Sequence, residues 1–279
     1  MKIGVITDCF KLSLEESLKT AAELGFDGVQ IYATIGDFSP EMSKEKRLEI
    51  KKLLASLGLE VSALCGDMGG HGFQIEKDNA ERVEKTKRII DLACDFDTKV
   101  VTTHIGVIPA DKSHPRYAVM LDALSRCGAY AKEKGVTLAI ETGPETADVL
   151  YDFVSAIDGG VGVNLDPANF VMVTGQDPVE AVELLGKYIV HTHVKDGVML
   201  KRTDPEMIYG CFAGETYESL NIGECFREMP LGEGDVDFPK YIDALRRIGY
   251  QGYLTVERET GDDPKSDIIL AKETVKKLM

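Results

Sequence analysis

Short apolar runs alternate with amphipathic stretches along the whole chain. The apolar runs are rich in Val, Ile and Leu, which is typical of strands buried in a parallel sheet. The amphipathic stretches repeat apolar residues at helix spacing. The runs that predict strands are residues 2–7, 28–32, 59–65, 99–105, 137–141, 161–166, 189–193 and 253–257. The stretches that predict helices are residues 13–24, 40–57, 76–96, 115–134, 146–157, 178–186, 238–248 and 264–278.

Signals at the helix ends agree with this pattern. Ser13 and Glu16 have the spacing of a capping box at the start of the first helix. Several helices are followed by a glycine just before the next strand, where a left-handed C-cap is expected. These glycines are Gly25, Gly58, Gly135 and Gly249.

Eight strand–helix steps in 279 residues predict an α/β fold, a closed (β/α)8 TIM barrel that forms one domain over residues 1–279. A doubly wound open sheet is the alternative, but no Gly-x-Gly-x-x-Gly follows the first strand. The stretch of about 197–234, between the seventh strand and its helix, is too long for an ordinary loop. We expect a lid or a substrate-selectivity loop there, with a subunit contact as the alternative.

Composition narrows the class of protein. Hydrophobic residues make up 44% of the chain, enough for one large core. The 47 acidic and 32 basic residues give a net charge of −15, which argues against a nucleic-acid partner. No apolar stretch approaches the length of a membrane span, and the N-terminus predicts a strand in place of a signal peptide. The six cysteines lack a Cys-x-x-Cys pair, so we expect reduced thiols in a cytoplasmic protein. Composition is compatible with both a monomer and a homo-oligomer.

Metal-binding side chains end four of the predicted strands. They are Glu141, Asp166, His193 and Glu257. The carboxyl ends of parallel strands meet at one edge of a barrel, so we expect these four groups to converge. Three carboxylates at close range would raise one another's pKa unless a cation neutralised them. Oxygen and nitrogen ligands in this combination suit one divalent metal ion.

Each of these predicted metal-binding residues, taken alone, has a simpler structural explanation. Glu141 could cap the following helix, and Asp166 precedes a proline, which is common in turns. Arg258 offers a salt bridge to an acid on either side of it. His191 alternates with His193 and would share its inward face, where it could be a packed core histidine. The joint pattern carries the prediction.

Two further histidines follow strands on the expected active face. His71 lies in the glycine-rich loop at residues 66–72, and His104 ends the fourth strand. We expect both to contact substrate, with a solvated loop as the alternative for His71. The chain has no Gly-x-Ser-x-Gly, no His-Glu-x-x-His and no phosphate loop of the Gly-x-x-x-x-Gly-Lys type.

The chain resembles the sugar phosphate isomerase/epimerase family, the xylose-isomerase-like TIM barrels. The most specific pieces are His-Thr-His-Val-Lys-Asp, which begins at His191, and Gly-Glu-Gly-Asp-Val-Asp-Phe, which ends at Phe238. The resemblance also covers Gly25-Phe-Asp-Gly-Val-Gln, Val136-Thr-Leu-Ala-Ile-Glu-Thr, Val163-Asn-Leu-Asp-Pro-Ala-Asn and Gly249-Tyr-Gln-Gly-Tyr-Leu-Thr-Val-Glu.

The resemblance implies that Glu141, Asp166, His193 and Glu257 bind one divalent cation, commonly Mn, Mg, Co or Zn. It implies proton transfer through an enediolate, with Glu141 and Glu257 as the catalytic groups. Lys195 would stabilise developing negative charge or a phosphate. The implied activity is isomerisation or epimerisation of a small sugar, sugar phosphate or inosose.

Some positions depart from the family pattern. Asn169 stands where many relatives carry a histidine, and we assign it to substrate binding. Ala147 and Met199 occupy places where ketose 3-epimerases carry a Glu and an Arg, so the metal residues match and those for that substrate do not. A lyase or dehydratase acting on a keto-sugar, inosose or keto-glycoside is the first alternative. A non-catalytic sugar-binding protein is the second.

Overall fold

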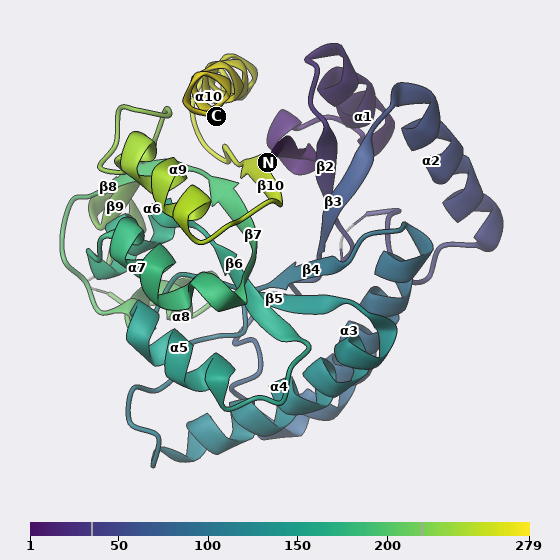
Figure 1. The fold of residues 1–279 in the computed structure, drawn as a ribbon. Coiled ribbons are helices and arrows are strands. Elements are labelled where there is room, and N and C mark those ends of the chain that lie inside the picture. Colours follow the sequence, from purple (N-terminus) through teal and green to yellow (C-terminus); the bar gives the residue numbers. More distant parts are fainter. Residues whose placement is uncertain (35, 219) are drawn as a thin grey trace.

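A closed barrel of parallel strands forms the centre of the molecule, as the sequence predicts (Figure 1). The computed structural model describes residues 1–34, 36–218 and 220–279. Among these residues, the barrel runs in the order β1-β10-β7-β6-β5-β4-β3-β2. Its strands are β1 (Lys2–Ile6), β2 (Gly28–Tyr32), β3 (Glu60–Cys65), β4 (Val100–Thr103), β5 (Thr137–Glu141), β6 (Val161–Leu165), β7 (Ile189–Val194) and β10 (Tyr253–Val256).

Helices surround the barrel, and one follows each strand (Figure 1). They are α1 (Leu14–Glu23), α2 (Lys44–Leu57), α3 (Glu76–Asp95), α4 (Pro115–Lys134), α5 (Ala147–Ser155), α7 (Pro178–Leu185), α9 (Phe238–Arg247) and α10 (Pro264–Leu278). The second helix begins at Lys44 and not at residue 40, because the Ser43 side chain accepts a hydrogen bond from Lys46 N and caps the helix there. No helix in the described residues has the length and apolarity needed to cross a bilayer.

The predicted helix caps are present. The Ser13 hydroxyl and the Glu16 side chain form the reciprocal capping box of α1. The four glycines that precede strands all have left-handed φ, between 68° and 76°. Only glycine adopts this conformation without a steric cost, so these residues end the helices and direct the chain into the next strand.

The barrel interior is polar where it approaches the carboxyl ends of the strands. The buried His191 Nε2 lies 2.9 Å from Gln30 Oε1 and 3.0 Å from Thr255 Oγ1. Gln30 Nε2 in turn donates to Thr102 Oγ1 over 3.3 Å. Burial and the neighbouring His193 hold the pKa of His191 well below its ordinary value. His191 is therefore a neutral, hydrogen-bonded core histidine that shares the inward face with His193, as the strand period predicts.

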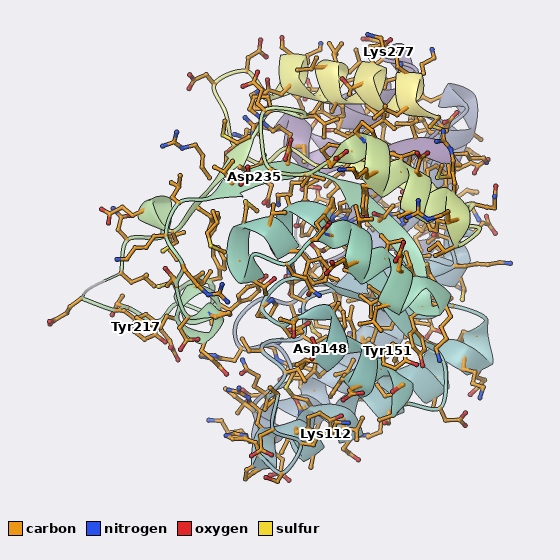
Figure 2. The ribbon with its side chains drawn as sticks, turned by 60° about the vertical axis from the view of Figure 1, so that its left-hand side comes forward. Lys112, Asp148, Tyr151, Tyr217, Asp235 and Lys277 are labelled. Carbon is orange, nitrogen blue, oxygen red and sulfur yellow. The ribbon has the colours of Figure 1, made fainter. Side chains whose placement is uncertain are left out.

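Residues 197–234 contain regular structure of their own. Strand β8 (Asp196–Met199) pairs antiparallel with β9 (Phe226–Met229), and α8 (Pro205–Phe212) lies between them. We call this hairpin with α8 the insert. It shares a small apolar core with the π-helical segment η2 (Phe170–Thr174). That core contains Ala168, Met172, Val173, Ile208 and Cys225. In Figure 2 the part of the insert that carries Tyr217 projects away from the barrel.

Asp196 fixes both ends of the insert. Its carboxylate accepts backbone hydrogen bonds from Gly197, Gly232, Gly234 and Val236, at distances between 2.8 and 3.2 Å. A Cβ at Gly234 would lie 2.1 Å from Asp196 Oδ1, so only glycine fits this close approach. The motif that begins at His191 and the motif that ends at Phe238 thus meet at the Asp196 carboxylate. This carboxylate fixes the backbone position next to Lys195.

Candidate active site

Four side chains from neighbouring strands meet at the carboxyl end of the barrel. Glu141 ends β5, Asp166 follows β6, His193 lies on β7 and Glu257 follows β10. Each is at most 6% exposed, and one ligand atom from each lies within 4.8 Å of the other three. The convergence predicted from the strand ends is therefore present in the fold.

The geometry and donor chemistry of this cluster fit one divalent cation. His193 Nδ1 lies 2.8 Å from Glu257 Oε2 and 3.5 Å from both Glu141 Oε1 and Asp166 Oδ2. Atoms that share one ion at about 2.1 Å are separated by roughly 3.0–3.4 Å. Asp166 Oδ2, His193 Nδ1 and Glu257 Oε2 are buried and lack an aligned hydrogen-bond partner among the residues that the structure describes. Buried polar atoms rarely stay unpaired without a reason, and a bound cation supplies one.

Asp166 is aimed by its local sequence. It is the N-cap of a short helical turn, α6 (Pro167–Asn169), and its Oδ1 accepts a hydrogen bond from Asn169 N at 3.1 Å. The Thr142 hydroxyl accepts from Asp166 N at 2.8 Å and donates to Asp166 O at 3.0 Å. One carboxylate oxygen is thus engaged by the backbone, and the other faces the cluster. Asp166 is a turn former and also a member of the cluster.

Two amide side chains orient the cluster from below. Gln30 Oε1 lies 3.2 Å from His193 Nε2, which makes it the acceptor for a proton on that nitrogen. This tautomer leaves the Nδ1 lone pair directed at the three carboxylates. Asn164 Nδ2 donates to Glu141 Oε2 at 3.2 Å. Sequence reasoning missed Gln30 and Asn164, although a polar residue inside an apolar strand was the available signal.

The carboxylates of the cluster favour the protonated form of His193. Burial lowers the pKa of His193, but the charges of Glu257 and Glu141 outweigh burial and raise it well above its usual range. Burial raises the pKa of Glu257, while Lys195 and His193 hold it below its usual value. The pKa of Glu141 is lowered against its burial by His104 and His193. The cluster therefore contains ionised carboxylates, as a metal site requires.

Lys195 and His104 are the cationic groups beside the cluster. Lys195 Nζ lies 2.8 Å from Glu259 Oε2 and 3.3 Å from Glu257 Oε1. Burial lowers the pKa of Lys195, but these two glutamates hold it well above its ordinary value. His104 lies 3.7 Å from Glu141 and 3.2 Å from Asp67. Against burial, Glu141 and Asp67 raise the pKa of His104 to about 10.

Arg258 forms its ion pairs away from the cluster. Its guanidinium lies 2.8 Å from Glu228 and 2.8 Å from Asp267. The interpretation that Arg258 pairs with an adjacent acid is therefore wrong, because its side chain turns toward β9 and α10. Glu257 and Glu259 instead lie beside Lys195, and Glu257 also contacts His193.

A cavity of about 620 Å³ opens above the cluster. His104, Asn169 and Lys195, three of the predicted substrate contacts, line it. Asn169 Nδ2 also donates to Thr142 O at 2.9 Å, which fixes its side chain.

His71, the fourth residue predicted to contact substrate, is not among the residues that line the cavity in the described part of the chain. The lining includes Gly69, Gly70 and Gly72 from its loop. The His71 imidazole lies 3.4 Å from Glu215 of the insert. The structure thus places His71 as a link between two loops at the rim of the cavity.

The insert contributes lining residues that sequence reasoning missed. Tyr209, Phe212 and Phe226 face the cavity from α8 and β9. They lie in a stretch without a clear strand or helix period, so no pattern pointed to them. Their position follows from the docking of the insert on the barrel.

The sequence matches known proteins over nearly its whole length. Residues 18–278 match the model of the xylose isomerase-like TIM barrel family. The chain is similar to L-ribulose-5-phosphate 3-epimerase UlaE of Shigella boydii, with 24% identity over 286 residues that cover 95% of this chain and 89% of that protein.

Solved structures share the fold. A xylose isomerase domain protein from Planctomyces limnophilus aligns with a TM-score of 0.79 and 27% identity, over 99% of this chain and 96% of that chain. The probable 3-DHS dehydratase AsbF from Bacillus anthracis aligns with a TM-score of 0.75 and 19% identity, over 99% of each chain.

Proposed function

The chain belongs to the xylose isomerase-like TIM barrel family, and we propose that it is a divalent-metal-dependent isomerase or epimerase of a small sugar, sugar phosphate or inosose. The observation that carries the proposal is the buried cluster of Glu141, Asp166, His193 and Glu257 at the carboxyl end of the barrel. The likeness to a ribulose-phosphate epimerase supports the same class of reaction.

The four residues of the cluster would hold one ion, Mn, Mg, Co or Zn. Their oxygen and nitrogen donors suit all of these ions. When bound, such an ion supplies a Lewis acid that lowers the pKa of the carbon-bound proton beside a carbonyl group. Glu141, His193 and Glu257 line the cavity, so a substrate carbonyl and its neighbouring hydroxyl would reach the ion through this cavity.

The two glutamates move the proton. Glu141 Oε1 and Glu257 Oε2 lie 3.5 Å and 2.8 Å from His193 Nδ1, and both glutamates are ionised, so either can accept a proton from a substrate carbon. Removal of the proton gives an enediolate. Return of a proton to the opposite face of the same carbon is epimerisation, and return to the adjacent carbon is isomerisation.

Other residues of the cavity stabilise charge and fix the substrate. The Lys195 ammonium lies beside Glu257 and would stabilise the negative charge that develops on the enediolate oxygens. His104 and Asn169 are placed to donate hydrogen bonds to substrate hydroxyl groups from the cavity wall. Asn169 is already oriented by its bond to Thr142.

Proton exchange with solvent tests this proposal directly. Keto-sugars, inososes and their phosphates are incubated in deuterated water with the protein and Mn²⁺, and incorporation at carbon is followed by NMR. We expect Glu257→Gln to lower exchange by about a hundredfold or more, because general base catalysis contributes that much. Glu133→Gln, at an exposed position, is the matched control. A Glu257→Gln variant with full activity would exclude this glutamate from the mechanism.

A lyase is the second candidate, because the cavity extends beyond the cluster and leaves room for a departing group. Both reactions begin with the same proton removal, so product analysis separates them. An isomeric product that carries deuterium identifies the isomerase or epimerase, and a product that has lost water or an aglycone identifies the lyase. Absence of exchange with every compound, in a protein that still binds Mn²⁺, would favour the non-catalytic alternative.

A further inference from the structure

The lining of the cavity has two chemically different parts. One part, the floor, is polar and contains Glu141, His193 and Glu257 of the cluster with Lys195 and His104. The other part comes from η2 and the insert; its charged residues are Arg227 and Glu228, and its apolar residues are called the wall. That wall consists of Met172, Val173, Tyr209, Phe212, Ile222 and Phe226. A volume of about 620 Å³ lies within the roughly 300–1,000 Å³ of sites that hold drug-sized ligands. A small sugar at the floor would leave the apolar wall uncovered.

A row of neighbouring aromatic rings connects the floor of the cavity to the wall. His104, which contacts Glu141, has its ring 6.1 Å from the Tyr209 ring. Tyr209 contacts Phe212 edge-on at 5.8 Å, and Phe212 lies 6.5 Å from Phe226. Phe212 is 61% exposed, although it is a large apolar residue beside a cavity. Phe212 and the partly exposed Tyr209 and Phe226 form one contiguous aromatic surface, and such a surface beside polar groups is typical of a binding site for an apolar group.

The wall is held in place without a ligand. On β9, Glu228 pairs with Arg258 at 2.8 Å and accepts a hydrogen bond from Glu259 N at 3.0 Å. The Arg116 side chain of α4 forms an ion pair with Glu206 at the start of α8. These contacts, together with Asp196, tie both ends and the middle of the insert to the barrel. Preorganisation of this kind favours binding, because little order has to be gained when the ligand arrives.

Charge at the rim does not favour an anionic substituent. Lys195 and Arg258 are already engaged by glutamates, and the cavity is also lined by Asp67, Glu228 and Glu259. Arg227 on β9 also lines the cavity, and its guanidinium would pair with a phosphate. A phosphate is therefore the competing occupant, and it belongs in the test.

We propose that the insert forms a fixed subsite for a nonpolar substituent, so that the substrate is a polyhydroxy carbonyl compound that carries an apolar or aromatic group. This inference rests on the proposed function for the polar end of the substrate. The metal cluster receives the carbonyl end, and Phe212 with its aromatic neighbours receives the substituent. The insert is then a selectivity element.

Binding to matched ligands tests this inference. The ligands are D-fructose and D-tagatose, the 6-O-benzyl ether of each, and the 6-phosphate of each, measured by calorimetry with Mn²⁺ present. We expect the benzyl ether of at least one sugar to bind ten times more tightly than both the free sugar and the phosphate. Phe212→Ser should lower the ratio of benzyl ether to free sugar affinity at least fivefold. Leu48→Ser, at an exposed position on α2, is the matched control and should leave the ratio unchanged.

The outcomes separate this inference from the proposed function. Benzyl ethers that bind no better than the free sugars, or that do not bind, would overturn the subsite. Tighter binding of the phosphates would overturn it in favour of an anion site at Arg227. A benzyl preference that depends on Phe212, in a protein that exchanges no substrate proton with solvent, would support the subsite and reject the proposed reaction.

Discussion

Glu145 is a buried acid whose protonation links stability to pH. It lies four residues after Glu141 and is 5% exposed, and its Oε2 has no hydrogen-bond partner in the described part of the chain. Burial raises the pKa of Glu145 to about 8, although backbone groups of Glu145 and Ile108 and the charge of His104 favour the ionised form. The folded protein therefore holds this proton at neutral pH, whereas the unfolded chain releases it near pH 4.5.

The direction and size of the effect follow from proton linkage. Below pH 4.5 the Glu145 carboxyl is protonated in both the folded and the unfolded state, so it does not make the free energy of unfolding depend on pH. Between pH 4.5 and about 8 the folded state binds one more proton than the unfolded state, so the free energy of unfolding falls by about 1.4 kcal/mol per pH unit. From pH 5.5 to pH 9 the loss that is due to Glu145 amounts to about 3 kcal/mol.

Substitution of Glu145 by Gln removes this titration. Urea unfolding of both proteins is measured at pH 5.5 and at pH 9 with a chelator present, so that metal binding does not contribute. We expect Glu145→Gln to gain about 3 kcal/mol relative to wild type between the two pH values. Exposed Glu133→Gln should show no such gain. Parallel pH dependences of wild type and Glu145→Gln would refute the reasoning, because they would mean that Glu145 is ionised in the fold.

Two further predictions concern the metal cluster and the insert. Mn²⁺ at one hundred times its dissociation constant should raise the Tm of wild type by about 4–5 °C. Scanning calorimetry of Asp166→Asn should show a much smaller shift, and an equal shift would remove Asp166 from the metal site. Asp196→Asn should lower the free energy of unfolding in urea by roughly 3–6 kcal/mol, because an amide cannot accept all four backbone hydrogen bonds. Exposed Asp235→Asn is the control, and equal stability of the two variants would contradict the role of Asp196.

The sequence alone was sufficient to predict the barrel and the convergence of four metal-binding side chains at one end of it. Both depend on local signals: strand and helix periods, glycines at helix ends, and a chemical change at the last residue of a strand. A parallel barrel places all its strand ends on one face, so Glu141, Asp166, His193 and Glu257 could be brought together without knowledge of the packing.

The tertiary structure decided how these groups are oriented and what surrounds them. Gln30 reaches His193 across 163 positions of the sequence, and Asp196 binds backbone groups about 40 residues away. The wall that contains Phe212 exists because the insert folds back over the barrel. Such contacts depend on long-range packing. The alternation of apolar and polar residues along a strand or helix carries no information about that packing. Side chains that are distant in sequence and close in space therefore had to be found in the fold.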